Sequence, residues 1–154
     1  GSGARFGAAQ EASLKMLEMS SGRIATRADT YLGVRHGPLS FVRPDTLIVC
    51  FISSDERLRA YELDLVGELI AKGLGISLVL VGVKIPREML RDDVISFSYE
   101  LVETLTDNEL SILDVVVGQL LGFFRCLHEG LKPDKPSPDN VITRVVRPFV
   151  IHAK

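Results

Sequence analysis

Two nearly unbroken apolar runs limit what this chain can fold into. Residues 45–53 read DTLIVCFIS and residues 76–83 read ISLVLVGV, with several β-branched side chains in each run. Runs without polar alternation are typical of strands covered on both faces, as in a parallel sheet. The segment between them predicts a helix over residues 56–72, because the polar cluster at 53–55 can cap its start and Gly73 its end. A strand, a helix and a second strand in this order predict a right-handed crossover.

The remaining elements follow from local composition. Residues 8–19 favour a helix, and so does the apolar stretch from Asp107 or Asn108 to about residue 128. Residues 23–28 and 94–97 predict short strands, and residues 85–91 predict a turn or a short helix. Helices that alternate with buried parallel strands indicate an α/β protein, so we expect a three-layer α-β-α sandwich with a mainly parallel sheet.

The two ends of the chain differ from this pattern. Residues 133–139 contain three prolines and cannot be helical, which separates one domain over residues 1–132 from a loop and C-terminal tail over residues 133–154. At the other end, Gly1-Ser2-Gly3 looks like the turn after a strand, with no strand before it. We therefore expect the C-terminal part of a longer protein, with the first strand missing. The alternative is that these three residues are a cloning remnant.

Composition excludes several classes of function. A formal charge of −2 argues against nucleic acid or an anionic membrane surface as the main partner. No unbroken apolar run approaches the roughly 20 residues of a membrane-spanning helix. Cys50 and Cys126 lie in apolar runs, which predicts buried free thiols and a cytoplasmic protein. The sequence has no CxxC pair and no cluster of histidines and cysteines, so we expect neither a metal site nor a cofactor.

A charged stripe on the first helix is the main candidate for chemistry. Glu11, Lys15 and Glu18 are spaced i, i+4, i+7 and fall within roughly 60° of one helix face. They form either a solvated strip, with an ion pair worth about 0.3–0.5 kcal/mol, or the wall of a polar cleft. In a cleft, the pKa values of a lysine and a glutamate can be tuned for proton transfer.

Two loops carry weaker candidates. His36 stands between Arg35 and Gly37-Pro38, where it is either a surface residue or a catalytic group held in place. The Gly1-Ser2-Gly3 turn precedes a helix, so its backbone N–H groups can cradle a phosphate.

These segments together resemble the sugar isomerase (SIS) domain family. The resemblance is carried by EASLKMLEMSSG at 11–22, RHGPLSF at 35–41, FISSDERLRAYELDLVGEL at 51–69 and TRVVRPFVIH at 143–152. The chain looks most like the second SIS domain of tagatose-6-phosphate ketose/aldose isomerases and of galactosamine-6-phosphate deaminases. The isomerase domain of glucosamine-6-phosphate synthase has a similar helix and a similar His-Gly-Pro. The resemblance implies a flavodoxin- or Rossmann-like sandwich.

The resemblance also implies roles for individual residues. Glu18 matches the carboxylate that moves a proton between C1 and C2 of the open-chain sugar. His36 matches the histidine that assists ring opening, which in this family reaches the active site of a neighbouring subunit. Lys15 matches a lysine that faces the sugar, with Glu11 one turn earlier.

Arg35 of the same loop, Arg144 of the tail and Gly1-Ser2-Gly3 complete the expected substrate-binding residues. The Ser/Thr-rich phosphate loop of the family belongs to its first SIS domain and has no counterpart here. We therefore expect residues 1–154 alone to be inactive.

Three functions remain open at this point. The leading expectation is a sugar-phosphate aldose–ketose isomerase or amino-sugar-phosphate deaminase that works through an enediol(ate), as a homodimer or higher oligomer. The alternative is a regulatory SIS domain that binds a sugar phosphate without catalysis. A third possibility is a structural dimerisation unit.

Overall fold

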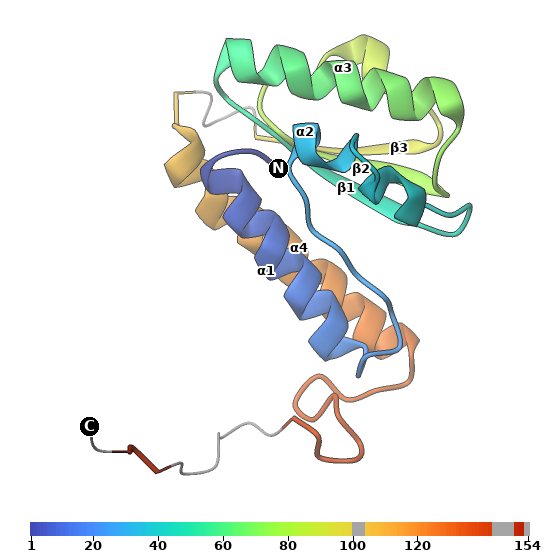
Figure 1. The fold of residues 1–154 in the computed structure, drawn as a ribbon, viewed down its shortest axis with the longest axis vertical. Helices are drawn as coiled ribbons and strands as arrows, with labels where there is room; N and C mark the ends of the chain where they lie inside the picture. The colour runs from blue at the N-terminus through green and yellow to red at the C-terminus, as the bar shows by residue number, and fades with distance from the viewer. Residues whose placement is uncertain (100–103, 143–149, 153–154) are drawn as a thin grey trace.

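The computed structural model describes residues 1–99, 104–142 and 150–152 (Figure 1). In chain order, its helices and strands are α1 (Ala4–Met19), α2 (Tyr31–Val34), the 3-10 helix η1 (Pro38–Phe41), β1 (Leu47–Ile52), α3 (Glu56–Lys72), β2 (Ser77–Gly82), the 3-10 helix η2 (Arg87–Met89), β3 (Val94–Ser98) and α4 (Asp107–His128).

The three strands form a parallel sheet in the order β1-β2-β3. Leu47 pairs with Ser77 at the start of β1, and Leu78 pairs with Val94 at the start of β3. Helix α3 covers one face of the sheet, and the helices α1 and α4, which run side by side in the same direction, lie on the other side (Figure 1). The expected three-layer arrangement with a parallel sheet is confirmed.

The two faces of the sheet build two separate clusters of buried side chains. Strand residues alternate between them: Cys50 and Ile52 point toward α3, whereas Phe51 packs with Ala9 and Ala12 of α1. Both faces are apolar because both are covered, which explains why the strands read as unbroken apolar runs. Cys50 and Cys126 are buried free thiols, as expected.

Capping residues determine where α3 and α4 begin and where α3 ends. The Asp55 carboxylate accepts a hydrogen bond from the Leu58 N–H at 2.8 Å, and Gly73 ends α3 in the left-handed conformation at φ 58°. Helix α4 is capped by Thr106, which forms a capping box with Glu109. The helix begins at Asp107, as expected, and the Asp107 carboxylate turns toward the loop after β1.

Residues 23–28 are not a strand, contrary to the sequence prediction. They return from the end of α1 alongside the helix pair to α2, and they join no ladder of the sheet (Figure 1). A short β-favouring segment needs a neighbouring strand for its hydrogen bonds, and this one passes along helices instead.

Small residues let α1 and α4 approach closely. A Cβ atom added at Gly118 of α4 would lie 2.6 Å from Ala12 Cβ and 2.9 Å from Ala12 Cα of α1. One turn later, a Cβ at Gly122 would lie 3.3 Å from the carbonyl oxygen of Lys15. The position of α1, and of the charged stripe on it, therefore depends on two glycines of α4.

We expect Gly118→Ala to destabilise the domain by about 1–3 kcal/mol, because an added methyl group must push two packed helices apart. Gly67→Ala is the matched control, since Gly67 is also helical and has open space around its Cα. That variant should gain about 0.4–1 kcal/mol from reduced freedom of the unfolded chain. Urea unfolding measures both variants. A Gly118→Ala domain as stable as Gly67→Ala would contradict the close packing.

Helix α4 also corrects an expectation about membranes. Among the described residues it alone has the length and composition to cross a membrane: it has 22 residues, and its most apolar window has a mean hydropathy of 1.7. Its charges at Asp107, Glu109, Asp114 and Arg125 interrupt the apolar sequence, so the helix contains no unbroken apolar run of membrane-spanning length. Core helices of globular proteins can have the same composition. Only 28% of its most apolar window is buried, so much of its apolar surface is exposed.

Candidate functional site

The charged stripe expected on α1 is present. Lys15 Nζ lies 2.6 Å from Glu18 Oε2 and 3.6 Å from Glu11 Oε1. About a third of each side chain is exposed, between 32% and 34%. The hydrogen bond to Glu18 raises the pKa of Lys15, against the opposing effect of burial. Within this domain the stripe is therefore partly solvated, and a cleft over it requires a second surface.

The loop that carries His36 is fixed to the opposite layer of the molecule. Arg35 Nε lies 3.3 Å from Glu68 Oε2 of α3, and Thr30 caps the short helix α2 by accepting from Gly33 N at 3.0 Å. Gly37 adopts φ 122°, which favours glycine, and Pro38 starts η1. The His36 side chain is exposed. The loop is thus attached to α3 and presents a solvent-facing imidazole.

His36 and Glu18 lie in different parts of the chain. Helix α2 and η1 lie beside the sheet, whereas the C-terminal end of α1 points away from it (Figure 1). Arg35 pairs with α3 rather than with the stripe. The structure therefore brings Glu11, Lys15 and Glu18 together, but it does not bring Arg35 and His36 of the same chain to them.

The Gly1-Ser2-Gly3 turn lies at the other end of α1 from Glu18. Sixteen residues of helix, at 1.5 Å each, separate the two ends by about 24 Å, which is longer than a hexose phosphate. Glu62 and Asp114 lie near the Gly1 amino group, whose pKa is lowered by burial. Arg144, the remaining expected binding residue, lies outside the described residues.

Comparison with known proteins identifies the domain. D-galactosamine-6-phosphate deaminase AgaS from Escherichia coli is 32% identical over 156 residues, covering 99% of this chain and 39% of that protein. The crystal structure of tagatose-6-phosphate ketose/aldose isomerase from Escherichia coli matches with a TM-score of 0.82 at 30% identity, over 97% of this chain and 38% of that one. No family model matches the chain.

A more distant structure has the same architecture. The C-terminal domain of glucosamine-fructose-6-phosphate aminotransferase from Francisella tularensis matches with a TM-score of 0.73 at 27% identity, over 88% of this chain and 36% of that one. The chain is an SIS domain. It spans about two fifths of the length of the curated relatives it matches, 39% for the deaminase above.

A buried ion pair that was not predicted from the sequence fixes α1 in the SIS domain. Arg5 donates from Nε and Nη2 to both carboxylate oxygens of Asp114, each at 2.7 Å, and both side chains are fully buried. Arg5 also donates to the carbonyl oxygen of Ile52 at the end of β1. Burial lowers the pKa of Arg5, but the hydrogen bond and charge of Asp114 outweigh this effect and raise it. The pair therefore joins α1, α4 and the sheet at one point.

Two more carboxylates, those of Asp107 and Glu62, accept hydrogen bonds from the loop after β1. Asp107 accepts from Ser54 N at 2.7 Å and from the hydroxyl groups of Ser53 and Ser54. Glu62 of α3 is fully buried and accepts from Ser53 N at 2.6 Å, while its Oε1 has no hydrogen-bond partner. Burial raises the pKa of Glu62, and the Ser53 hydrogen bond opposes that rise.

We expect the free energy of unfolding of Glu62→Gln to increase relative to that of the native domain as pH rises. The pKa of Glu62 is higher in the folded than in the unfolded state, so its ionisation favours unfolding as pH rises above the unfolded value of 4.5. Glutamine keeps an oxygen for Ser53 N and has no charge to lose. Urea unfolding at about pH 4 and about pH 7 measures the difference in free energy. A stability difference that is the same at both values would contradict a raised pKa.

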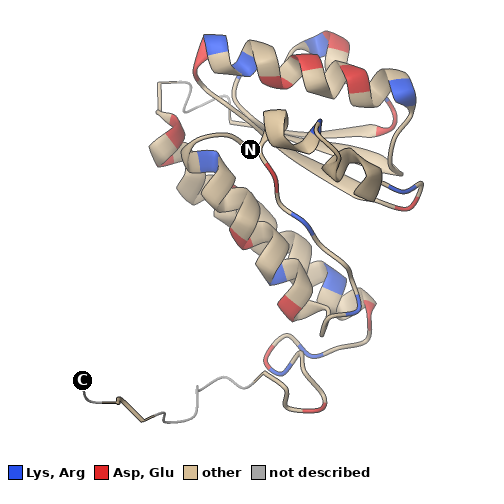
Figure 2. Cartoon of the chain, viewed as in Figure 1, with Lys and Arg blue, Asp and Glu red and all other residues tan. Residues whose placement is uncertain are grey.

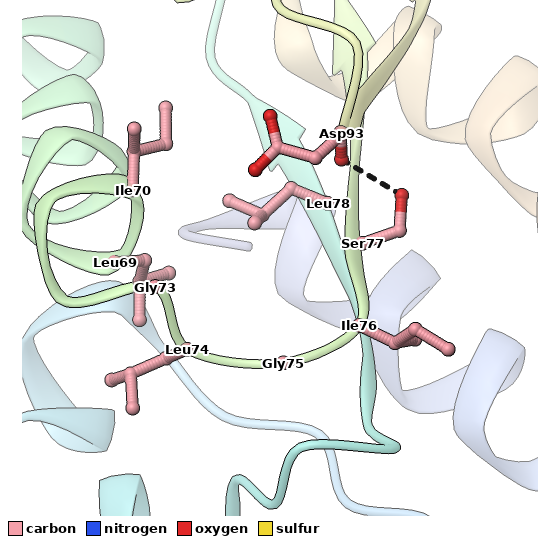
Figure 3. Close-up of a pocket in the computed structure, with 9 residues that line it drawn as sticks. All are labelled: Leu69, Ile70, Gly73, Leu74, Gly75, Ile76, Ser77, Leu78 and Asp93. Carbon is pink, nitrogen blue, oxygen red and sulfur yellow. Dashed lines mark hydrogen bonds between the residues drawn. The ribbon is translucent and has the colours of Figure 1, made fainter.

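The hollows of the SIS domain lie away from the stripe. A cavity of about 60 Å³ lies beside the turn between α3 and β2, where the Ser77 hydroxyl donates to the Asp93 carbonyl at 2.9 Å (Figure 3). It is too small for a sugar. An open depression of about 470 Å³ lies near the start of α4, and its lining includes Ser54, Asp55 and residues 104–108. Asp55 and Thr106 in its lining cap α3 and α4.

Proposed function

We propose that this SIS domain supplies the proton-transfer residues for a reaction of a phosphorylated sugar. The reaction is aldose–ketose isomerisation, or isomerisation coupled to loss of ammonia from an amino sugar phosphate. One observation carries the proposal: a carboxylate and an ammonium group lie 2.6 Å apart on a partly exposed face of α1. The names of the relatives, a deaminase and a ketose/aldose isomerase, support the same substrate class.

Glu18 is the proposed base. It takes the proton from the carbon next to the carbonyl group of the open-chain sugar, which leaves an enediolate, and returns that proton to the neighbouring carbon. Lys15 donates a hydrogen bond to the oxygen on which negative charge develops. Glu11, 3.6 Å from the Lys15 ammonium, keeps this lysine oriented and charged.

His36 is the proposed acid and base for opening the sugar ring. An imidazole exchanges protons near neutral pH, as this step requires. Because its loop is attached to α3 through Arg35, we propose that His36 serves the Glu18 site of a neighbouring copy. We propose that residues other than 1–3 bind the phosphate group of the sugar. Within this chain, Arg144 of the tail is the candidate.

Turnover tests the proposal directly. The protein encoded by the complete reading frame that contains these residues is incubated with tagatose 6-phosphate and with galactosamine 6-phosphate in D₂O, and NMR follows product and deuterium at C2. The proposal expects deuterium incorporation with at least one substrate. Binding detected by a thermal shift, without exchange or product, would instead indicate a regulatory domain that holds sugar phosphate. No binding and no exchange would leave only a structural role.

A further inference from the structure

Gly122 of α4 contacts the part of the α1 backbone that carries the Lys15 side chain. A Cβ atom added at Gly122 would lie 3.3 Å from the carbonyl oxygen of Lys15, 3.4 Å from its carbonyl carbon and 3.5 Å from Cγ of Met19. Because 3.3 Å is closer than is usual for a Cβ atom, a side chain at this position would shift Lys15 by a few tenths of an ångström. The backbone of α4 therefore sets the position of the turn that carries Lys15 and Glu18.

Two other contacts between the helices hold an earlier part of α1. Asp114 binds the side chain of Arg5 near the start of α1, and Gly118 faces Ala12, whose side chain has no chemistry to offer. Figure 2 shows charged residues of both signs along the C-terminal half of α1, where α4 runs beside it. The contact at Gly122 is thus the one that touches the backbone of a charged residue of the stripe.

The geometry of this turn governs the ion pair on it. Lys15 Nζ and Glu18 Oε2 lie 2.6 Å apart, on residues three positions apart along the helix. Since about a third of each side chain is exposed, the backbone is the main support that fixes where the pair lies. Groups that transfer protons must be held within about 0.5 Å of their productive position. A displacement of a few tenths of an ångström in the backbone is therefore large enough to slow proton transfer.

We propose that Gly122 is a positioning residue for the proton transfer by Glu18 and Lys15, an inference that rests on the proposed function. Because Gly122 has no side chain, α4 lies directly against the Lys15 backbone and fixes Glu18 relative to the carbon from which it takes the proton. A methyl group at position 122 moves the pair away from that geometry. The loss falls on the transition state, so it lowers kcat more than it raises KM.

Exchange kinetics of Gly122→Ala test this inference in the protein encoded by the complete reading frame. The substrate is whichever of tagatose 6-phosphate and galactosamine 6-phosphate the native protein deuterates in D₂O. The kcat for exchange should fall about 10-fold, with KM changed by less than about twofold. Gly67→Ala is the matched control, because Gly67 lies within α3 and a Cβ there meets no atom within 4 Å. It should exchange at the native rate, and circular dichroism confirms that both variants are folded.

A double variant tests whether Gly122 acts through Glu18. Glu18→Gln/Gly122→Ala should exchange no more slowly than Glu18→Gln alone, because the position of the turn no longer matters once the base is gone. Three outcomes would overturn the inference: a further 10-fold loss in the double variant, a native kcat in Gly122→Ala, or a Gly122→Ala protein that does not fold. Failure of the proposed function is a different result, namely a native protein without exchange or a Glu18→Gln protein with native exchange.

Discussion

Asp114→Asn is expected to lower the free energy of unfolding by about 3–5 kcal/mol, which is a large part of the stability of a domain this size. The variant removes the carboxylate that binds the fully buried Arg5 guanidinium through two hydrogen bonds, and it leaves only the Asp107 carboxylate, 3.7 Å away, as a negative partner. An arginine cannot lose its proton to escape this cost. Chemical denaturation at neutral pH measures the change.

Two further variants separate the buried charge from general disruption. Arg5→Met/Asp114→Leu removes both charges and fills similar volume, so it should cost far less than Asp114→Asn, although the Ile52 carbonyl loses its donor. Asp93→Asn breaks an exposed pair with Arg91, in which both side chains are more than half exposed, and should change stability by less than about 1 kcal/mol. A double variant as unstable as Asp114→Asn would show that packing, not charge, sets the cost.

The sheet could be predicted because its strands are covered on both faces. An apolar run carries that information by itself, and the position of α3 between two such runs fixed the parallel direction of β1 and β2. The stripe on α1 could be predicted because residues three and four apart on a helix are neighbours whatever the tertiary structure.

The buried ion pair could not be predicted, because it joins residues 109 positions apart. A signal existed: Arg5 and Asp114 are single charges within otherwise apolar stretches of two helices, and a buried charge requires a partner. The hydrophobic periodicity of α4 also did not predict which side of the helix is buried. It shows that the helix is apolar on every side, but not that α1 covers one side and leaves the other exposed.

Glu18→Gln is expected to reduce proton exchange at C2 of the substrate by about 10²–10⁴-fold in the protein encoded by the complete reading frame, with KM nearly unchanged. Glutamine has the shape of glutamate and keeps an oxygen that can accept from Lys15 Nζ, so α1 should keep its structure. It has no basic carboxylate to take the proton. Deuterium incorporation from D₂O, followed by NMR, measures the exchange.

Glu129→Gln is the matched control for this substitution. Glu129 also pairs with a cation at 2.6 Å, the guanidinium of Arg125, but it lies at the end of α4 rather than on the α1 stripe. Its variant should exchange at the native rate. If Glu18→Gln also retained native exchange, Glu18 would not be the base. If it lost exchange only through a raised KM, Glu18 would act in binding. A fall in kcat alone requires a group that acts in the transition state, which is the role that the 2.6 Å pair with Lys15 suggests for Glu18.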